Sequence, residues 1–288
     1  MPFLIAVSFI WAFSFGIIGS RLSGLDSTFV ATARLSIAWL CFAPFFRLAG
    51  LGRGDLIALV GIGSLQFGAM YVAYIRAFAF LPSHLVALFS VLTPLYIALA
   101  YDLMRRRWQW SLIACALLSV AGAAVIKFSQ PSGDIWAGFA LMQVANLSFG
   151  LGQLMYREWR LKRPGINDSQ VMAALYAGGA AFAGFAFLIW GDWRTIAPSG
   201  EQALAILYLG AVASGLGFYL WNKGAARSSA GALAAANNAV VPLAMAASLF
   251  LFGESSAIAA ASVSKLLAGA ALIFGAMLWG QRIGRVTR

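Results

Sequence analysis

Side chains that could bind a small organic solute stand within long apolar segments of this chain rather than in its loops. They are aromatic rings, hydroxyls and amides, which hold an amphipathic molecule through ring contacts and hydrogen bonds. The candidates are Trp11, Ser14, Phe15, Tyr71, Tyr74, His84, Asn146, Tyr219, Trp221, Asn237 and Asn238. Each could instead bond a neighbouring helix, because a buried polar group needs a partner where water is absent.

Groups that perform catalysis or bind metal do not cluster in these segments. All nine Asp and Glu residues fall in expected loops or at helix ends, and the chain has one histidine. There is no GxxxxGK[ST] loop and no metal-spaced group of Cys and His. We therefore expect neither an enzyme nor an ATP-driven pump, and no metal or cofactor. Arg34 is the one cation inside an apolar segment, where it could snorkel to the interface or bond between helices.

The elements that must position these groups are membrane-spanning helices. The chain of 288 residues is 62% hydrophobic and 10% charged, whereas a soluble domain has about 25% charged residues. Because a bilayer core needs about 20 apolar residues in helical form, the apolar runs predict an all-α integral membrane protein with ten helices. Their ranges are 3–20, 28–46, 56–81, 83–101, 110–126, 136–155, 171–190, 203–221, 230–252 and 257–279.

The basic residues indicate how these helices are oriented. On alternate sides of the ten predicted helices, Lys and Arg divide fourteen to five, and both chain ends lie on the richer side. Cytoplasmic loops carry the excess of Lys and Arg. We therefore expect an inner-membrane protein with cytoplasmic N- and C-termini. The net charge of +11 is assigned to orientation within the lipid bilayer and not to nucleic acid.

Short matches between the two halves of the chain indicate an internal repeat. The Ser14-Phe15-Gly16 motif recurs at 148–150, the YVAYIR end of helix three corresponds to FYLWNK of helix eight, and Pro94 corresponds to Pro242. The offsets are 134, 147 and 148 residues, in the same order. Since five helices are an odd number, halves 1–130 and 131–288 would be inverted five-helix repeats, with a substrate site between them. Either proline could be a static kink; as a matched pair, we interpret them as hinges.

These motifs resemble those of the drug/metabolite transporter superfamily, and in particular its ten-helix EamA-type exporters. The resemblance covers essentially the whole chain and includes Gly122 and Gly275. The arrangement of these motifs is similar in particular to that of aromatic amino-acid exporters of the family. It implies a central cavity lined by helices one, three, four, six, eight and nine, with five and ten as a scaffold. One departure is Gly224, where the family usually has alanine.

The sequence therefore predicts an inner-membrane transporter that exports small amphipathic metabolites by alternating access. Amino acids, aromatic ones first, are the expected substrates, with aromatic side chains holding the apolar part. No acid lies in mid-span, which favours a uniporter without obligatory ion coupling. The sequence gives no sign of an obligatory protein partner. The alternatives are a proton-coupled exporter of other metabolites or drugs, and a channel-like pore.

Overall fold

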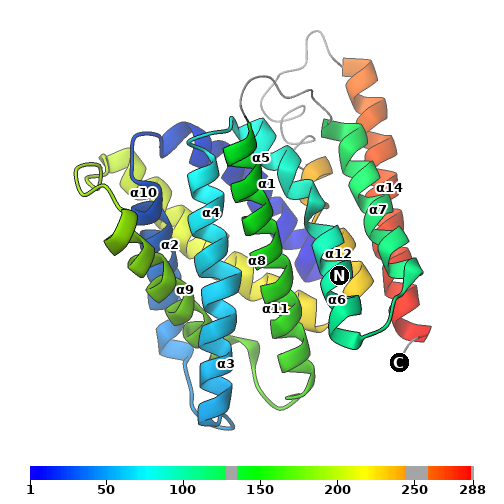
Figure 1. The fold of residues 1–288 in the computed structure, drawn as a ribbon, viewed down its shortest axis with the longest axis horizontal. Coiled ribbons are helices and arrows are strands. Elements are labelled where there is room, and N and C mark those ends of the chain that lie inside the picture. The colour runs from blue at the N-terminus through cyan, green and yellow to red at the C-terminus, as the bar shows by residue number, and fades with distance from the viewer. Residues whose placement is uncertain (128–134, 244–258, 287–288) are drawn as a thin grey trace.

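The computed structural model describes residues 1–127, 135–243 and 259–286, and every regular element in these ranges is helical. Figure 1 shows that these helices pack side by side in one bundle. The α-helices are α1 (Pro2–Arg21), α2 (Ser27–Phe42), α3 (Arg53–Gly63), α4 (Met70–Ala77), α5 (Ser83–Phe89), α6 (Thr93–Arg105), α7 (Trp110–Lys127), α8 (Trp136–Leu161), α9 (Asp168–Trp190), α10 (Gly200–Tyr208), α11 (Gly217–Ala226), α12 (Ala230–Ala236) and α14 (Ala259–Val286).

Short irregular helices join several of these elements into longer rods. The π-helix η2 (Ser64–Ala69) joins α3 to α4, and the π-helix η4 (Leu209–Leu216) joins α10 to α11. The 3₁₀-helix η3 (Ser90–Leu92) joins α5 to α6, and a second one, η1 (Ala43–Phe45), follows α2. The described residues thus form ten helical stretches in chain order, at the places that the apolar runs predict.

Some helix boundaries differ from the predicted ones because particular residues end a helix early or extend it. The 3₁₀-turn η1 contains Pro44, which has no N–H to continue α2. Helix α8 continues to Leu161, beyond the predicted end at 155, because Arg157 and Arg160 are good helix formers. Of the predicted ninth helix, residues 240–243 are helical after α12, and 244–252 lie outside the described residues, as do 257 and 258.

Five helical stretches are long and apolar enough to cross a membrane, judged by length and composition within the described ranges. They are Ser27–Phe45, Arg53–Ala77, Asp168–Trp190, Gly200–Ala226 and Ser264–Ile283. Three shorter apolar stretches are Pro2–Ser14, Trp110–Ile126 and Ala230–Leu243. Large apolar side chains such as Leu188 and Leu267 are exposed on the outside of the bundle, which is the surface expected of a protein surrounded by lipid.

Helices from the first and second halves of the chain pack in corresponding pairs. The second and seventh stretches, α2 and α9, pack together, as do the fifth and tenth, α7 and α14, which lie side by side at one edge of Figure 1. Between these pairs, α4 packs on α8 and α1 packs on α11. The pair α7–α14 comes close at Gly122, where an added Cβ would be 2.8 Å from the Gly269 carbonyl oxygen.

The two π-helices occupy equivalent places in the two halves. Shifting η2 by the 147 residues that separate Tyr71 from Phe218 places it at 211–216, within η4. In a π-helix the backbone bonds i to i+5, which widens the turn and often marks a functional site. Ser214 Oγ donates to the carbonyl oxygen of Leu209, five residues earlier, at 2.8 Å. Gly68 lies in η2, and Gly210 and Gly215 lie in η4; glycine weakens regular α-helix.

Candidate functional site

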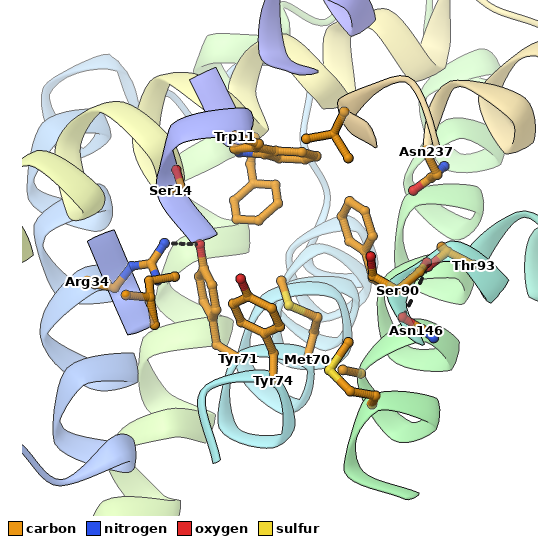
Figure 2. A pocket seen from close by; sticks show the side chains of 16 residues that line it. Trp11, Ser14, Arg34, Met70, Tyr71, Tyr74, Ser90, Thr93, Asn146 and Asn237 are labelled. Carbon is orange, nitrogen blue, oxygen red and sulfur yellow. Dashed lines mark hydrogen bonds between the residues drawn. The ribbon is translucent and has the colours of Figure 1, made fainter. Parts of the chain in front are cut away.

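A cavity of about 120 Å³ lies in the middle of the bundle, at the level of these irregular segments. Figure 2 shows its side chains. The first, second and third stretches contribute Trp11, Ser14, Ile18, Arg34, Met70, Tyr71 and Tyr74; the fourth, sixth, eighth and ninth contribute Ser90, Thr93, Met142, Ala145, Asn146, Phe149, Phe218, Asn237 and Val240. These are the helices that the family resemblance implies, with the addition of α2 through Arg34.

The cavity is partly open and extends from mid-bundle toward one end of the bundle. Ile18 lies three residues before the end of α1, Tyr74 three before the end of α4, and Met142 near the start of α8. These three helix ends lie at the same end of the bundle, near the top of Figure 1.

Aromatic rings close the other side of the cavity. The Trp11 ring packs on Phe218 and Phe149, with centroids 5.1 and 5.8 Å away, and on Trp221 at 4.8 Å. Trp11 Nε1 donates to the carbonyl oxygen of Ala213 in η4 at 2.9 Å. Trp11 therefore joins α1 to the π-helix and forms the wall that separates the cavity from Trp221.

Side-chain amides from both halves of the chain form hydrogen bonds behind this aromatic wall, and Asn237 of the cavity lining joins them. Trp221 Nε1 donates to Gln153 Oε1 at 2.8 Å, and Gln153 Nε2 donates to Asn237 Oδ1 at 3.3 Å. Gln66 Nε2 donates to Asn222 Oδ1 at 2.8 Å. These hydrogen bonds join helices of the two halves on that side of the cavity.

The fourth stretch is broken beside the cavity, and side chains satisfy its freed carbonyl groups. Pro94 is the second residue of α6 and has no N–H to offer the Ser90 carbonyl. Thr93 Oγ1 lies 2.8 Å from that oxygen and donates to it. Asn146 Nδ2 donates to the Phe89 carbonyl at 2.7 Å, and Asn238 Nδ2 donates to that of Val91 at 3.1 Å. Irregular backbone inside a membrane protein is tolerated where neighbours supply such bonds.

The ninth stretch is broken at the corresponding position. A turn at 237–239 separates α12 from the helical residues 240–243, which include buried Pro242. The 148-residue offset of the prolines places η3 opposite residues 238–240. Thus both prolines follow an existing break and do not kink a continuous helix, and their role as hinges stays a prediction.

Six of the eleven predicted site residues line the cavity: Trp11, Ser14, Tyr71, Tyr74, Asn146 and Asn237. Trp221 lies behind the wall, and Asn238 is 1% exposed and bonds the break in the fourth stretch. Tyr219 packs on Phe42, with ring centroids 5.4 Å apart, and accepts from Lys223 Nζ at 3.1 Å. The side chains of Phe15 and His84 lie outside the described part of the structure.

Sequence reasoning left Arg34 out of the site, although its unusual position was visible. The side chain is 2% exposed and lines the cavity, so it does not snorkel to the interface. Its Nη2 donates to Tyr71 Oη at 2.7 Å and to Ser214 Oγ at 3.3 Å. A cation inside a membrane span is rare and marks a functional position; that signal alone could have placed Arg34 in the site.

An all-helical apolar bundle with a central cavity, lined by aromatic rings and a few polar groups and located between the two halves of the chain, is the architecture of a membrane transporter. The chain belongs to the EamA-like transporter family, whose model matches residues 1–128 and 136–281. It is therefore a membrane transporter and not an enzyme.

Relatives match over most or all of the chain. A "Probable biotin transporter" of Pseudomonas aeruginosa is 36% identical over 99% of this chain and 98% of its own. A "Biotin transporter" of Salmonella typhimurium is 34% identical over 98% and 93%, and one of Escherichia coli is 36% identical over 88% and 85%. These names give no support to the expected likeness to aromatic amino-acid exporters in particular.

A solved structure described as "Crystal structure of protein" has a similar fold. Its TM-score is 0.72 at 20% identity, and the match covers 98% of this chain and 96% of that one. At this identity the likeness concerns the fold alone.

Proposed function

We propose that this chain carries biotin, or a closely similar ureido acid, across the membrane by alternating access. The observation that carries the proposal is the distribution of polar groups in the cavity. Arg34 lies on one side and Thr93, Asn146 and Asn237 lie on the other, with aromatic rings between them (Figure 2). The printed names of relatives that match nearly the full chain support the same substrate.

The chemistry of biotin suits this distribution. One end of the molecule is a ureido ring with two N–H donors and a carbonyl acceptor, and the other is a carboxylate on an apolar chain. The side-chain oxygens of Asn146 and Asn237 can accept from the ring N–H groups, while their own N–H groups already bond oxygen atoms within the protein. Trp11, Phe149 and Met70 offer apolar contact to the part between.

Amino acids, the substrates expected from sequence, are less well supported. An amino acid carries an ammonium group and a carboxylate on the same carbon, so a site with an anion close to a cation suits it best. Neither Asp nor Glu occurs among the described side chains that line the cavity. Burying an ammonium group without a counter-charge is costly, which favours a substrate whose only charge is negative.

The mechanism that we propose uses the matched breaks as joints between two inverted halves, residues 1–130 and 131–288. Residues that close one side of the cavity in this conformation, such as Trp11 and Trp221, would separate while the open side closes. The closed side argues against a channel.

We expect Pro94→Ala and Pro242→Ala to slow transport while leaving substrate binding intact, because an added N–H favours a straight helix over the broken one. Parent transport rates in both variants would show that the breaks do not move.

The orientation in the cell follows from the loop charges. We propose that the protein lies in the inner membrane with both termini in the cytoplasm, so that the described conformation opens to the outside. Exposed arginines such as Arg106 and Arg107 lie at the closed end of the bundle. A C-terminal reporter that becomes active only after export from the cytoplasm would contradict this orientation.

Binding to the purified protein tests the substrate. Labelled biotin should bind to the protein in lipid nanodiscs and be displaced by excess biotin, but not by phenylalanine or threonine. Trp11→Ala should weaken binding roughly 3- to 10-fold, because a well-placed ring contact contributes about 1 kcal/mol. Trp108→Ala, at an exposed ring between α6 and α7, is the matched control and should bind as the parent does. Displacement of a label by phenylalanine, with no biotin binding, would favour the amino-acid alternative.

A further inference from the structure

Arg34 is a buried cation without a counter-ion in the residues that the structure describes. It stands in the middle of α2, is 2% exposed, and takes part in none of the ion pairs found among those residues. Its only described hydrogen bonds run from Nη2 to two neutral hydroxyls, those of Tyr71 and Ser214. Its charge is therefore held in place but not neutralised.

Two of its nitrogen atoms are free to bind something else. Nε and Nη1 are buried and have no hydrogen-bond partner among the described residues, although a guanidinium group has five N–H donors. The residue also lines the cavity. Burying an unpaired charge and leaving its donors unsatisfied both cost free energy. An anion that entered the cavity would remove both costs at once.

We infer that Arg34 binds the carboxylate of the transported solute and thereby favours carboxylic acids over their uncharged analogues. Guanidinium groups suit carboxylates because their planar N–H donors match the two oxygens. The inference rests on the proposed function and deepens it. It names the side chain that recognises the substrate, and it gives the orientation of the substrate in the cavity. Figure 2 shows Arg34 on the side of α2 and Asn146 and Asn237 across the cavity. In the inferred pose the carboxylate therefore lies against α2 and the uncharged ring lies near the two amides.

Tyr71 and Ser214 are positioning residues for this anchor. The Tyr71 ring lies beneath the guanidinium, whose carbon is 4.4 Å from the ring centroid, and its hydroxyl is 2.9 Å from Ser214 Oγ. Ser214 belongs to η4, so the anchor joins α2 and α4 to the π-helix of the other half. These bonds use Nη2 and leave Nη1 and Nε for the carboxylate.

The test compares biotin with its uncharged primary amide, as competitors of labelled biotin, on the full-length protein in nanodiscs. The parent should bind the acid roughly 10- to 100-fold more tightly than the amide, the range for a hydrogen bond to a charged group. Arg34→Gln should lose this preference, with affinities for acid and amide within threefold of each other. Arg76→Gln is the matched control, because it removes an exposed positive charge from the end of α4, and should keep the preference.

Two further measurements keep the outcome decisive. If Arg34→Gln does not fold, the acid-to-amide ratio of the parent decides, together with Tyr71→Phe, which should lower that ratio several-fold by releasing the guanidinium. If biotin does not bind at all, stabilisation of the parent by 5-phenylpentanoate but not by its amide, lost in Arg34→Gln, would support the anchor while the biotin proposal fails. Equal binding of acid and amide by the parent, or an acid preference retained in Arg34→Gln, would overturn the inference.

Discussion

Replacing Gly63 by alanine should destabilise the whole bundle. Gly63 ends α3 where that helix crosses α9, and a Cβ added there would overlap the carbonyl oxygen of Leu175. In the opposite direction, a Cβ on Gly178 would overlap the carbonyl oxygen of Val60. The obstacles are backbone atoms, so no change of rotamer relieves them and the two helices must move apart.

The expected magnitude follows from the cost of overpacking. Forcing extra atoms into a packed core costs about 1–3 kcal/mol, which for a protein of this size corresponds to a melting temperature lower by roughly 2–5 °C. We expect this shift for Gly63→Ala and for Gly178→Ala in a thermal scan of the detergent-solubilised protein. Gly61→Ala is the matched control, because Gly61 lies on the same helix with open space around it. Equal melting temperatures for Gly61→Ala and Gly63→Ala would show that the α3–α9 crossing is looser than described.

Membrane potential should set the distribution of the substrate. A uniporter of a monoanion moves one negative charge per cycle, and one charge crossing 100 mV changes the free energy by about 2.3 kcal/mol. Since about 1.4 kcal/mol corresponds to a factor of ten, 100 mV should shift the equilibrium inside-to-outside ratio about 50-fold. This shift is expected only if the substrate crosses as an anion and no coupled ion crosses with it.

Proteoliposomes with equal pH on both sides and an imposed potassium diffusion potential measure this effect. Labelled biotin should be excluded at inside-negative potential and accumulated at inside-positive potential. The primary amide of biotin should distribute equally at either potential, which controls for leaks. A ratio that ignores the potential but follows an imposed pH gradient would show that each carboxylate crosses with a proton. That result would favour the proton-coupled alternative and would leave the binding site unchanged.

The sequence predicted the helices well because each apolar run is long enough to decide its own structure. The family resemblance implied a cavity lined by helices one, three, four, six, eight and nine; the described cavity is lined by these helices and by α2, and three of the aromatic candidates, Trp11, Tyr71 and Tyr74, lie on its wall. What could not be predicted is where these helices are irregular. The π-helices η2 and η4 depend on tertiary bonds such as Trp11 to Ala213, between residues 202 positions apart, and no local pattern contains that information.

The candidate polar residues show the same limit. Asn146 and Asn238 are alike in sequence, since each is an amide within an apolar run. In the structure Asn146 lines the cavity and also bonds the Phe89 carbonyl, whereas Asn238 bonds the Val91 carbonyl out of reach of the cavity. Arg34 differs, because a cation in mid-span is a local signal. Its surroundings, two neutral hydroxyls and free donors, appear only when α2, α4 and η4 are assembled.

Counterflow of biotin tests most directly whether this chain is a carrier for it. Proteoliposomes are loaded with unlabelled biotin and diluted into a trace of labelled biotin, with equal pH and salt on both sides. A carrier that alternates between two openings exchanges label for unlabelled substrate, so the labelled biotin should rise inside above its outside concentration and then decline. Liposomes without protein should show no such peak. Simple equilibration of the label, at a rate that does not depend on the loaded biotin, would contradict the account.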